Sequence, residues 1–110
     1  MTKIRMNWKD MELTAEGHSG GGERGKDIIC AGISALTQAL LNQLLIEDPE
    51  GTRYRINEKK GSIRIRSNPM LKDRERIRNY FRVIITGLRA WEQAFPDNVK
   101  MEEVNEDGIA

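Results

Sequence analysis

Residues 11–36 read MELTAEGHSGGGERGKDIICAGISAL, and three different patterns follow one another within them. Residues 11–16 alternate apolar and polar side chains, which predicts a half-buried strand. Five of the nine residues from Gly17 to Gly25 are glycine, which predicts a mobile loop that approaches a ligand closely and closes over it. The apolar segment after Asp27 predicts a helix that runs to about Ile46, with Asp27 as its N-cap.

The same patterns continue on both sides of this stretch. We expect a short strand over residues 3–8, a turn at Lys9-Asp10, two strands over 53–57 and 63–66 joined by a turn at 58–61, and an edge strand over 99–102. The last residues, 105–110, are expected to fray.

A second helix is expected to begin with Asn68 as its cap and Pro69 in its first position, and to end before Pro96. Its apolar residues recur at helical spacing and predict a core-facing stripe of Ile77, Tyr80, Phe81, Ile84, Leu88, Trp91 and Phe95. The order of elements is therefore ββαββαβ, which predicts an α+β fold of one domain over residues 1–110. Its sheet should be antiparallel or mixed, with about five strands and two helices.

Composition narrows the class of protein. The formal net charge of +1, from 18 basic and 17 acidic residues, is no global signature of a partner such as nucleic acid or membrane. The single cysteine excludes an internal disulfide and fits a reducing compartment, so we expect a cytoplasmic protein. The first eight residues lack the apolar stretch of a signal peptide. Residues 28–46 carry no charge and approach membrane-spanning length, but their five polar side chains favour a helix buried in a soluble domain.

The only histidine, His18, and the only cysteine, Cys30, flank the glycine-rich loop. A thiol in the first turn of a helix is favoured as a thiolate, and an imidazole beside it can act as its base. The alternative is a packed, inert cysteine and a histidine with a structural role. Ser34 lies one turn after Cys30 and either positions the thiolate or substrate or donates to the carbonyl one turn back. Asp27 caps the helix, orients His18 or does both, and capping is the simpler role.

Other motif interpretations are weaker. Gly20-x-x-x-x-Gly25-Lys26-Asp27 is one residue from a phosphate-binding P-loop, but its last position carries a carboxylate where a hydroxyl belongs. One cysteine and one histidine cannot complete a tetrahedral metal site, so no cofactor or metal is expected.

The hairpin carries a basic cluster of Arg53, Arg55, Lys59, Lys60, Arg64 and Arg66. This cluster is either a solvated sheet face or the binding surface of a non-enzymatic module that recognises RNA or the ribosome. Its outward face has no aromatic residue on which bases would stack, so nucleic acid is the less expected partner. Rapid alkylation of Cys30 by iodoacetamide would favour the enzyme over this binding module.

One resemblance is specific. Gly17-His18-Ser19-Gly20, followed by residues 25–36, which read GKDIICAGISAL, closely resembles the Prp family of ribosomal-processing cysteine proteases. The family pattern is Gly-His-(Ala or Ser)-Gly, a short loop, then Gly-x-Asp-Ile-Val-Cys-Ala-(Ala or Gly)-Val-Ser-Ala-Leu. The segment from Thr86-Gly87-Leu88 to Phe95-Pro96 is also similar to the family's final helix.

The resemblance implies a small protease, commonly a homodimer, that acts on a protein substrate without a cofactor. Members remove a short N-terminal extension from a large-subunit ribosomal protein, cutting after a phenylalanine pair, and phage relatives are thought to process capsid or scaffold proteins. By matching position, Cys30 is the nucleophile and His18 the base. The supporting positions are Gly17, Asp27 and Ser34, and the substrate loop comprises Ser19, Gly20, Gly21, Gly22 and Gly25.

Overall fold

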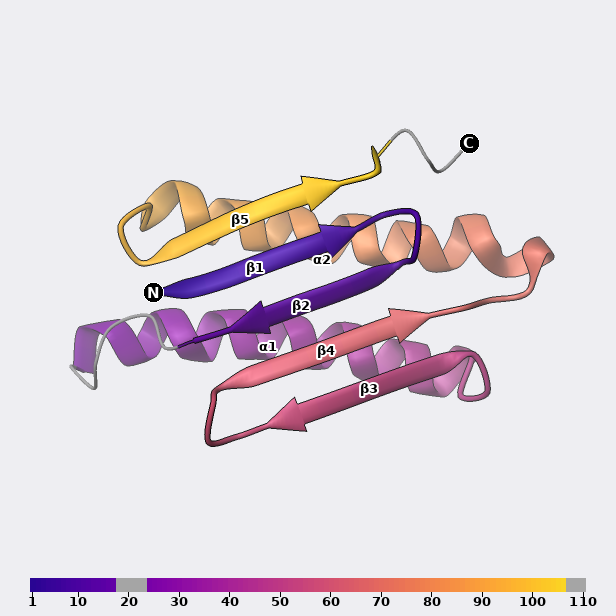
Figure 1. Ribbon diagram of the computed structural model, residues 1–110, viewed down its shortest axis with the longest axis horizontal. Coiled ribbons are helices and arrows are strands. Elements are labelled where there is room, and N and C mark those ends of the chain that lie inside the picture. The colour runs from indigo at the N-terminus through magenta and orange to yellow at the C-terminus, as the bar shows by residue number, and fades with distance from the viewer. Residues whose placement is uncertain (18–23, 107–110) are drawn as a thin grey trace.

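A five-stranded sheet carries two long helices on one of its faces in the computed structural model (Figure 1). The structure describes residues 1–17 and 24–106, except for the side chains of residues 24–27. The elements are β1 (Thr2–Asn7), β2 (Glu12–Glu16), α1 (Arg24–Glu47), β3 (Thr52–Asn57), β4 (Ser62–Ser67), the short 3-10 helix η1 (Leu71–Asp73), α2 (Arg74–Ala94) and β5 (Val99–Val104). This order confirms the predicted α+β fold, ββαββαβ, with two helices.

The sheet is mixed and its strands run in the order β3-β4-β2-β1-β5. Neighbouring strands are antiparallel except β1 and β5, which pair in parallel. β5 lies at one edge, as predicted, and β3 forms the other. Because side chains alternate along a strand, one face of the sheet carries the apolar residues and the other carries the charged ones.

Both helices cover the apolar face, and the opposite face has no helix over it (Figure 1). The largest fully buried side chains come from the sheet and from both helices: Phe81, Met6, Met11, Leu13, Ile29, Leu40, Leu44, Ile65, Ile77, Leu88 and Val99. Burying each such side chain contributes about 1.5–3 kcal/mol. The predicted stripe of the second helix is confirmed except at its end, since Phe95 is 38% exposed, and Ile85 joins it in the core.

Gly32 lets the two helices approach closely. A Cβ built on this residue would overlap the indole ring of Trp91, which itself stacks on Phe95 with ring centroids 5.8 Å apart. The absence of a side chain at Gly32 therefore fixes how α2 packs against the N-terminal half of α1. That half of α1 carries Cys30.

The first helix begins earlier than predicted. α1 starts at Arg24, so Asp27 is its fourth residue and not its N-cap, and Gly25 lies in the first turn and not in the loop. The first turn of a helix accepts both an acidic residue and a glycine, so neither marks the boundary. The other loop residues, His18, Ser19, Gly20, Gly21 and Gly22, lie outside the described residues.

The second helix begins later than predicted. Asn68 and Pro69 precede η1, and α2 starts only at Arg74. The N–H of Ser67 donates to the Met11 carbonyl at 3.0 Å and that of Asn68 to the Gly51 carbonyl at 2.8 Å. These two bonds hold the chain against neighbouring turns, and Met70 is still extended, with φ −63° and ψ 150°, so helical structure begins only at η1.

The uncharged first helix is less buried than predicted. By length and composition, residues Ile28–Glu47 could cross a membrane. In the structure this segment packs one side on the sheet and α2, while Ile28 is 64% and Ile46 76% exposed. Its outer side consists largely of alanine and small polar residues, which explains the absence of charge without complete burial.

Candidate active site

A groove of about 380 Å³ lies at the end of the sheet where β1 starts and β2 ends. Figure 1 shows the N-terminal half of α1 and the β3–β4 turn at this same end. The groove is lined by Thr2, Ala15, Gly17, Cys30, Ile33, Ser34, Thr37, Gln38, Ile56, Asn57, Glu58, Gly61, Ser62 and Ile63. A larger hollow of about 670 Å³ lies on the charged face of the sheet and contains none of the predicted catalytic residues.

Cys30 is half-buried in the wall of this groove. Its neighbour Ile29 is only 2% exposed and faces the core, which turns Cys30 toward the groove. Since α1 begins at Arg24, Cys30 is in the second helical turn, so the prediction of a first-turn thiol is wrong. The influence of the helix terminus falls off within one turn, so a base near the groove matters more than predicted.

Ser34 shares the groove with Cys30, as the four-residue spacing predicted. Within the described part of the chain its hydroxyl donates no hydrogen bond, so the satisfied structural role is not the one observed. Instead Thr37 makes the bonds to the preceding turn, donating to the carbonyls of Ile33 at 3.1 Å and Ser34 at 3.2 Å. The Ser34 hydroxyl is therefore available to a ligand in the groove.

Gly17 stands at the rim of the groove and fixes the direction in which the chain leaves β2. Its φ of +98° is disfavoured for other residues, and a Cβ there would overlap the carbonyl oxygen of Met1. Glycine is thus required at this position on two counts. The next residue along the chain is His18, which lies outside the described residues, so the structure joins Gly17, Cys30 and Ser34 but leaves His18 untested.

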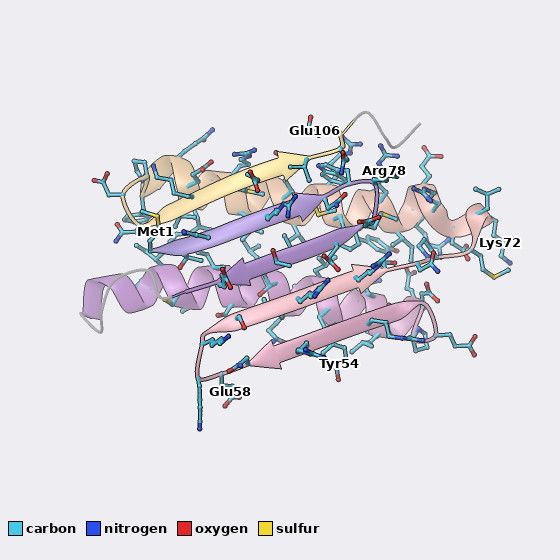
Figure 2. The ribbon with its side chains drawn as sticks, in the orientation of Figure 1. Met1, Tyr54, Glu58, Lys72, Arg78 and Glu106 are labelled. Carbon is cyan, nitrogen blue, oxygen red and sulfur yellow. The ribbon has the colours of Figure 1, made fainter. Side chains whose placement is uncertain are left out.

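Sequence reasoning missed the wall formed by the hairpin. Ile56 and Ile63 supply apolar surface there, and Glu58 in the β3–β4 turn is the one charged residue lining the groove in the described ranges (Figure 2). The alternation over residues 53–57 predicted the strand, but Ile56 is 44% exposed because β3 is an edge strand. Nothing in the local sequence shows that this hairpin lies beside α1. Gln38, eight residues after Cys30, could have been found from helical spacing.

One polar atom in the groove wall has no protein partner. Thr2 is 4% exposed, and its Oγ1 makes no hydrogen bond, while its backbone N–H donates to the Asn98 carbonyl at 2.8 Å. Among the described residues no three His, Cys, Asp or Glu side chains lie close enough together to hold a metal ion. The groove therefore offers a thiol, several hydroxyls, two side-chain amides, one carboxylate and an apolar wall, which suits an extended peptide.

Comparison with known proteins agrees with this arrangement. The family model described as cysteine protease Prp matches residues 1–100. Prp from S. aureus in complex with a substrate peptide superposes with a TM-score of 0.78 at 20% identity, covering 94% of this chain and 99% of that one. The same enzyme with a covalently linked product peptide gives 0.78 at 22% identity, with the same coverage. SMU.848 from Streptococcus mutans gives 0.73 at 21% identity, covering 93% and 90%. No curated protein matches the sequence.

Proposed function

Because this chain belongs to the Prp family of cysteine proteases, we propose that it cleaves a peptide bond with Cys30 as nucleophile and His18 as base. The observation that carries the proposal is the groove in which Cys30, Ser34 and Gly17 meet. Gly17 directs the chain at its rim, and His18 is the next residue.

The chemistry follows from these groups. His18 takes the proton of the Cys30 thiol, and the thiolate attacks the carbonyl carbon of the substrate. The imidazolium then gives its proton to the leaving amine, which leaves a thioester on Cys30. Water, deprotonated by the same imidazole, hydrolyses the thioester and restores the thiol. The backbone N–H groups of the first turn of α1 have no partner within the helix and are the natural donors to the oxyanion, and the hydroxyl of Ser34 is placed to orient the substrate.

The substrate would lie between α1 and the β3–β4 hairpin. Ile56 and Ile63 give this side of the groove apolar surface, which suits a phenylalanine side chain next to the scissile bond. The S. aureus relative was crystallised with a substrate peptide and with a covalently linked product peptide, which supports a peptide in the groove here.

The substrate we propose is a large-subunit ribosomal protein with a short N-terminal extension that ends in a phenylalanine pair. The description of the S. aureus relative as a ribosomal processing protease supports this choice. A phage capsid or scaffold protein with a similar site is the alternative substrate. We further propose that the enzyme works in the cytoplasm, where ribosomes are assembled, and as a homodimer.

The test is incubation with a peptide that contains a Leu-Gln-Phe-Phe-Ala site, followed by mass spectrometry. We expect one cleavage after the phenylalanine pair, and we expect Cys30→Ala and Cys30→Ser to abolish it while the protein still folds. Ala31→Ser is the matched control, because this neighbouring side chain is exposed and does not line the groove. Cleavage by purified Cys30→Ala protein would exclude Cys30 as the nucleophile. The same conclusion would follow if Ala31→Ser lost activity while the Cys30 variants kept it.

A further inference from the structure

The face of the sheet that carries no helix is strongly basic. By alternation along the five strands, the outward side chains include seven cations and three carboxylates. The cations are Lys3, Arg5, Arg53, Arg55, Arg64, Arg66 and Lys100, and the acids are Glu12, Glu16 and Glu102. This local excess of positive charge is hidden in the formal net charge of +1 for the whole chain.

Four of the arginines form a square on β3 and β4. Arg53 pairs directly with Arg66 across the two strands, and Arg55 pairs with Arg64. Like charges directly opposite one another on a sheet are destabilising. Two such pairs side by side therefore reduce the stability of the hairpin unless something outside the chain neutralises them.

The protein itself neutralises only one corner of this arginine square. Arg64 contacts the carboxylate of Glu12 at 2.9 Å. Arg53 donates to two backbone carbonyls, those of Glu50 and Thr52. In the described part of the chain, Arg55 and Arg66 have no hydrogen-bond or ion-pair partner. At least two guanidinium groups are thus exposed and unpaired on one flat surface.

We propose that the arginine square and the cations around it bind the phosphate backbone of double-stranded RNA. Guanidinium groups bind phosphate oxygens in a bidentate way, and the square spans about 5 Å across the strands and about 7 Å along them. Hollows of about 350 Å³ and 670 Å³ lie over Arg55 and Arg64 and leave room for a ligand. By alternation Tyr54 belongs to the other face, but it is 53% exposed on the edge strand β3 and is the one aromatic residue that lines the smaller hollow. A single ring gives no row of stacking platforms, so the surface suits stacked, paired bases better than splayed single strands.

Other occupants fit this surface less well. A second copy related by a twofold axis would place the same basic face against itself. An acidic peptide presents one row of carboxylates, whereas the square is two residues wide. A wide, shallow RNA minor groove bordered by two rows of phosphates suits a basic face whose cations lie on β1 and β5 as well as on β3 and β4. The choice of RNA over DNA rests on the proposed function, because the precursor of a ribosomal protein lies among structured RNA.

The arginine square and the groove of Cys30 are on opposite faces of the sheet. The chain can therefore hold RNA and a substrate peptide at the same time. The inferred role of the RNA contact is to bring the protease to precursor that is already part of a ribosomal particle.

The experiment measures binding of a fluorescein-labelled RNA hairpin by anisotropy at several salt concentrations between about 50 and 200 mM. We expect Arg55→Gln with Arg66→Gln to weaken binding at least tenfold and to reduce the slope of log affinity against log salt by about 1–2. The matched control, Lys72→Gln with Arg74→Gln, removes the same charge from η1 and the first residue of α2, away from the square, and should leave the affinity unchanged. Because Arg55 and Arg66 have no partners, their replacement should not lower the unfolding temperature.

Each possible result of this experiment either supports or contradicts RNA binding by the arginine square. Absence of RNA binding at about 50 mM salt, or equal weakening in both double variants, would overturn the proposal. Equal affinity for a DNA hairpin of the same sequence would mean that the surface does not select RNA. Tighter binding of polyglutamate would identify an acidic peptide as the ligand. A dimer that only the Arg55/Arg66 double variant disrupts would identify a second copy of the chain as the ligand. The double variant should still cleave the Leu-Gln-Phe-Phe-Ala peptide, and Cys30→Ala should still bind RNA. These two measurements therefore distinguish a failure of the RNA-binding proposal from a failure of the proposed protease activity.

Discussion

Cys30 is exposed to its groove from the second turn of α1, so its reactivity depends less on the helix terminus than its sequence context predicted. The thiol needs a neighbour to take its proton. Of the residues in the chain, His18 is the only imidazole, and Gly17 fixes the direction of the backbone one residue before it. The proposed dyad of Cys30 and His18 therefore depends on one proton transfer, from the thiol to the imidazole.

We expect His18→Ala to slow the alkylation of Cys30 by iodoacetamide at least tenfold at neutral pH, because the imidazole is the available base. Peptide cleavage should fall by at least about 100-fold. The measurement is the mass of the intact protein over time, with Ala31→Ser as the control, because this exposed residue keeps the dyad and does not line the groove. A wild-type alkylation rate in His18→Ala would show that other groups control the thiol, and the dyad would need to be replaced.

At the scale of the elements, the position of Cys30 depends on how α1 and α2 pack. The contact between Gly32 and Trp91 sets their separation over the turn that carries Cys30. Two opposite effects are expected from a methyl group at Gly32. The higher helix propensity of alanine stabilises by up to about 1 kcal/mol, whereas overlap with a rigid ring destabilises by about 1–3 kcal/mol.

We expect the overlap with the Trp91 ring to outweigh the gain in helix propensity, so that Gly32→Ala lowers the free energy of unfolding in urea by about 1–2 kcal/mol. The control is the double variant with Trp91→Leu, in which the smaller side chain makes room and the two changes are not additive. If Gly32→Ala is as stable as the wild type, the helices are free to separate and the packing argument for the groove is wrong.

For the whole molecule, the sequence predicted the order of elements because alternation and helical spacing are local signals. It also placed Cys30 and Ser34 on one helical face. It failed at the starts of both helices: Asp27 and Asn68 are good caps by residue type, but α1 already begins at Arg24 and the chain is still extended at Met70. The hairpin wall at Ile56 and the pairing of arginines on β3 and β4 could not be predicted either, because strand register and hairpin position depend on contacts distant in sequence.

One ionic network connects α2 to β5, which returns to pair with β1 and closes the fold. Arg89 donates to Glu103 at 2.7 Å and to Glu92 at 2.8 Å, and Glu92 also accepts the backbone N–H of Met101 at 2.7 Å. The hydrogen bond to Glu103 raises the pKa of Arg89. Partial burial acts to raise the pKa of Glu92, but the bonds from Arg89 and Met101 outweigh it and hold that pKa below its ordinary value.

A lowered carboxyl pKa means that the folded state prefers the charged form of Glu92. Its contribution to stability is therefore present above the ordinary glutamate pKa and is lost as the pH falls through the lower value in the folded protein. We expect Glu92→Gln to lower the free energy of unfolding by about 1 kcal/mol at neutral pH, through loss of a charge-assisted hydrogen bond, and to have little effect in acid. Urea unfolding at both pH values measures this difference. The control, Glu102→Gln, breaks an exposed pair with Arg5 and should change stability by less than about 0.5 kcal/mol at either pH. An equal loss at both pH values would show that Glu92 acts through packing, and that the charge does not hold α2 to β5.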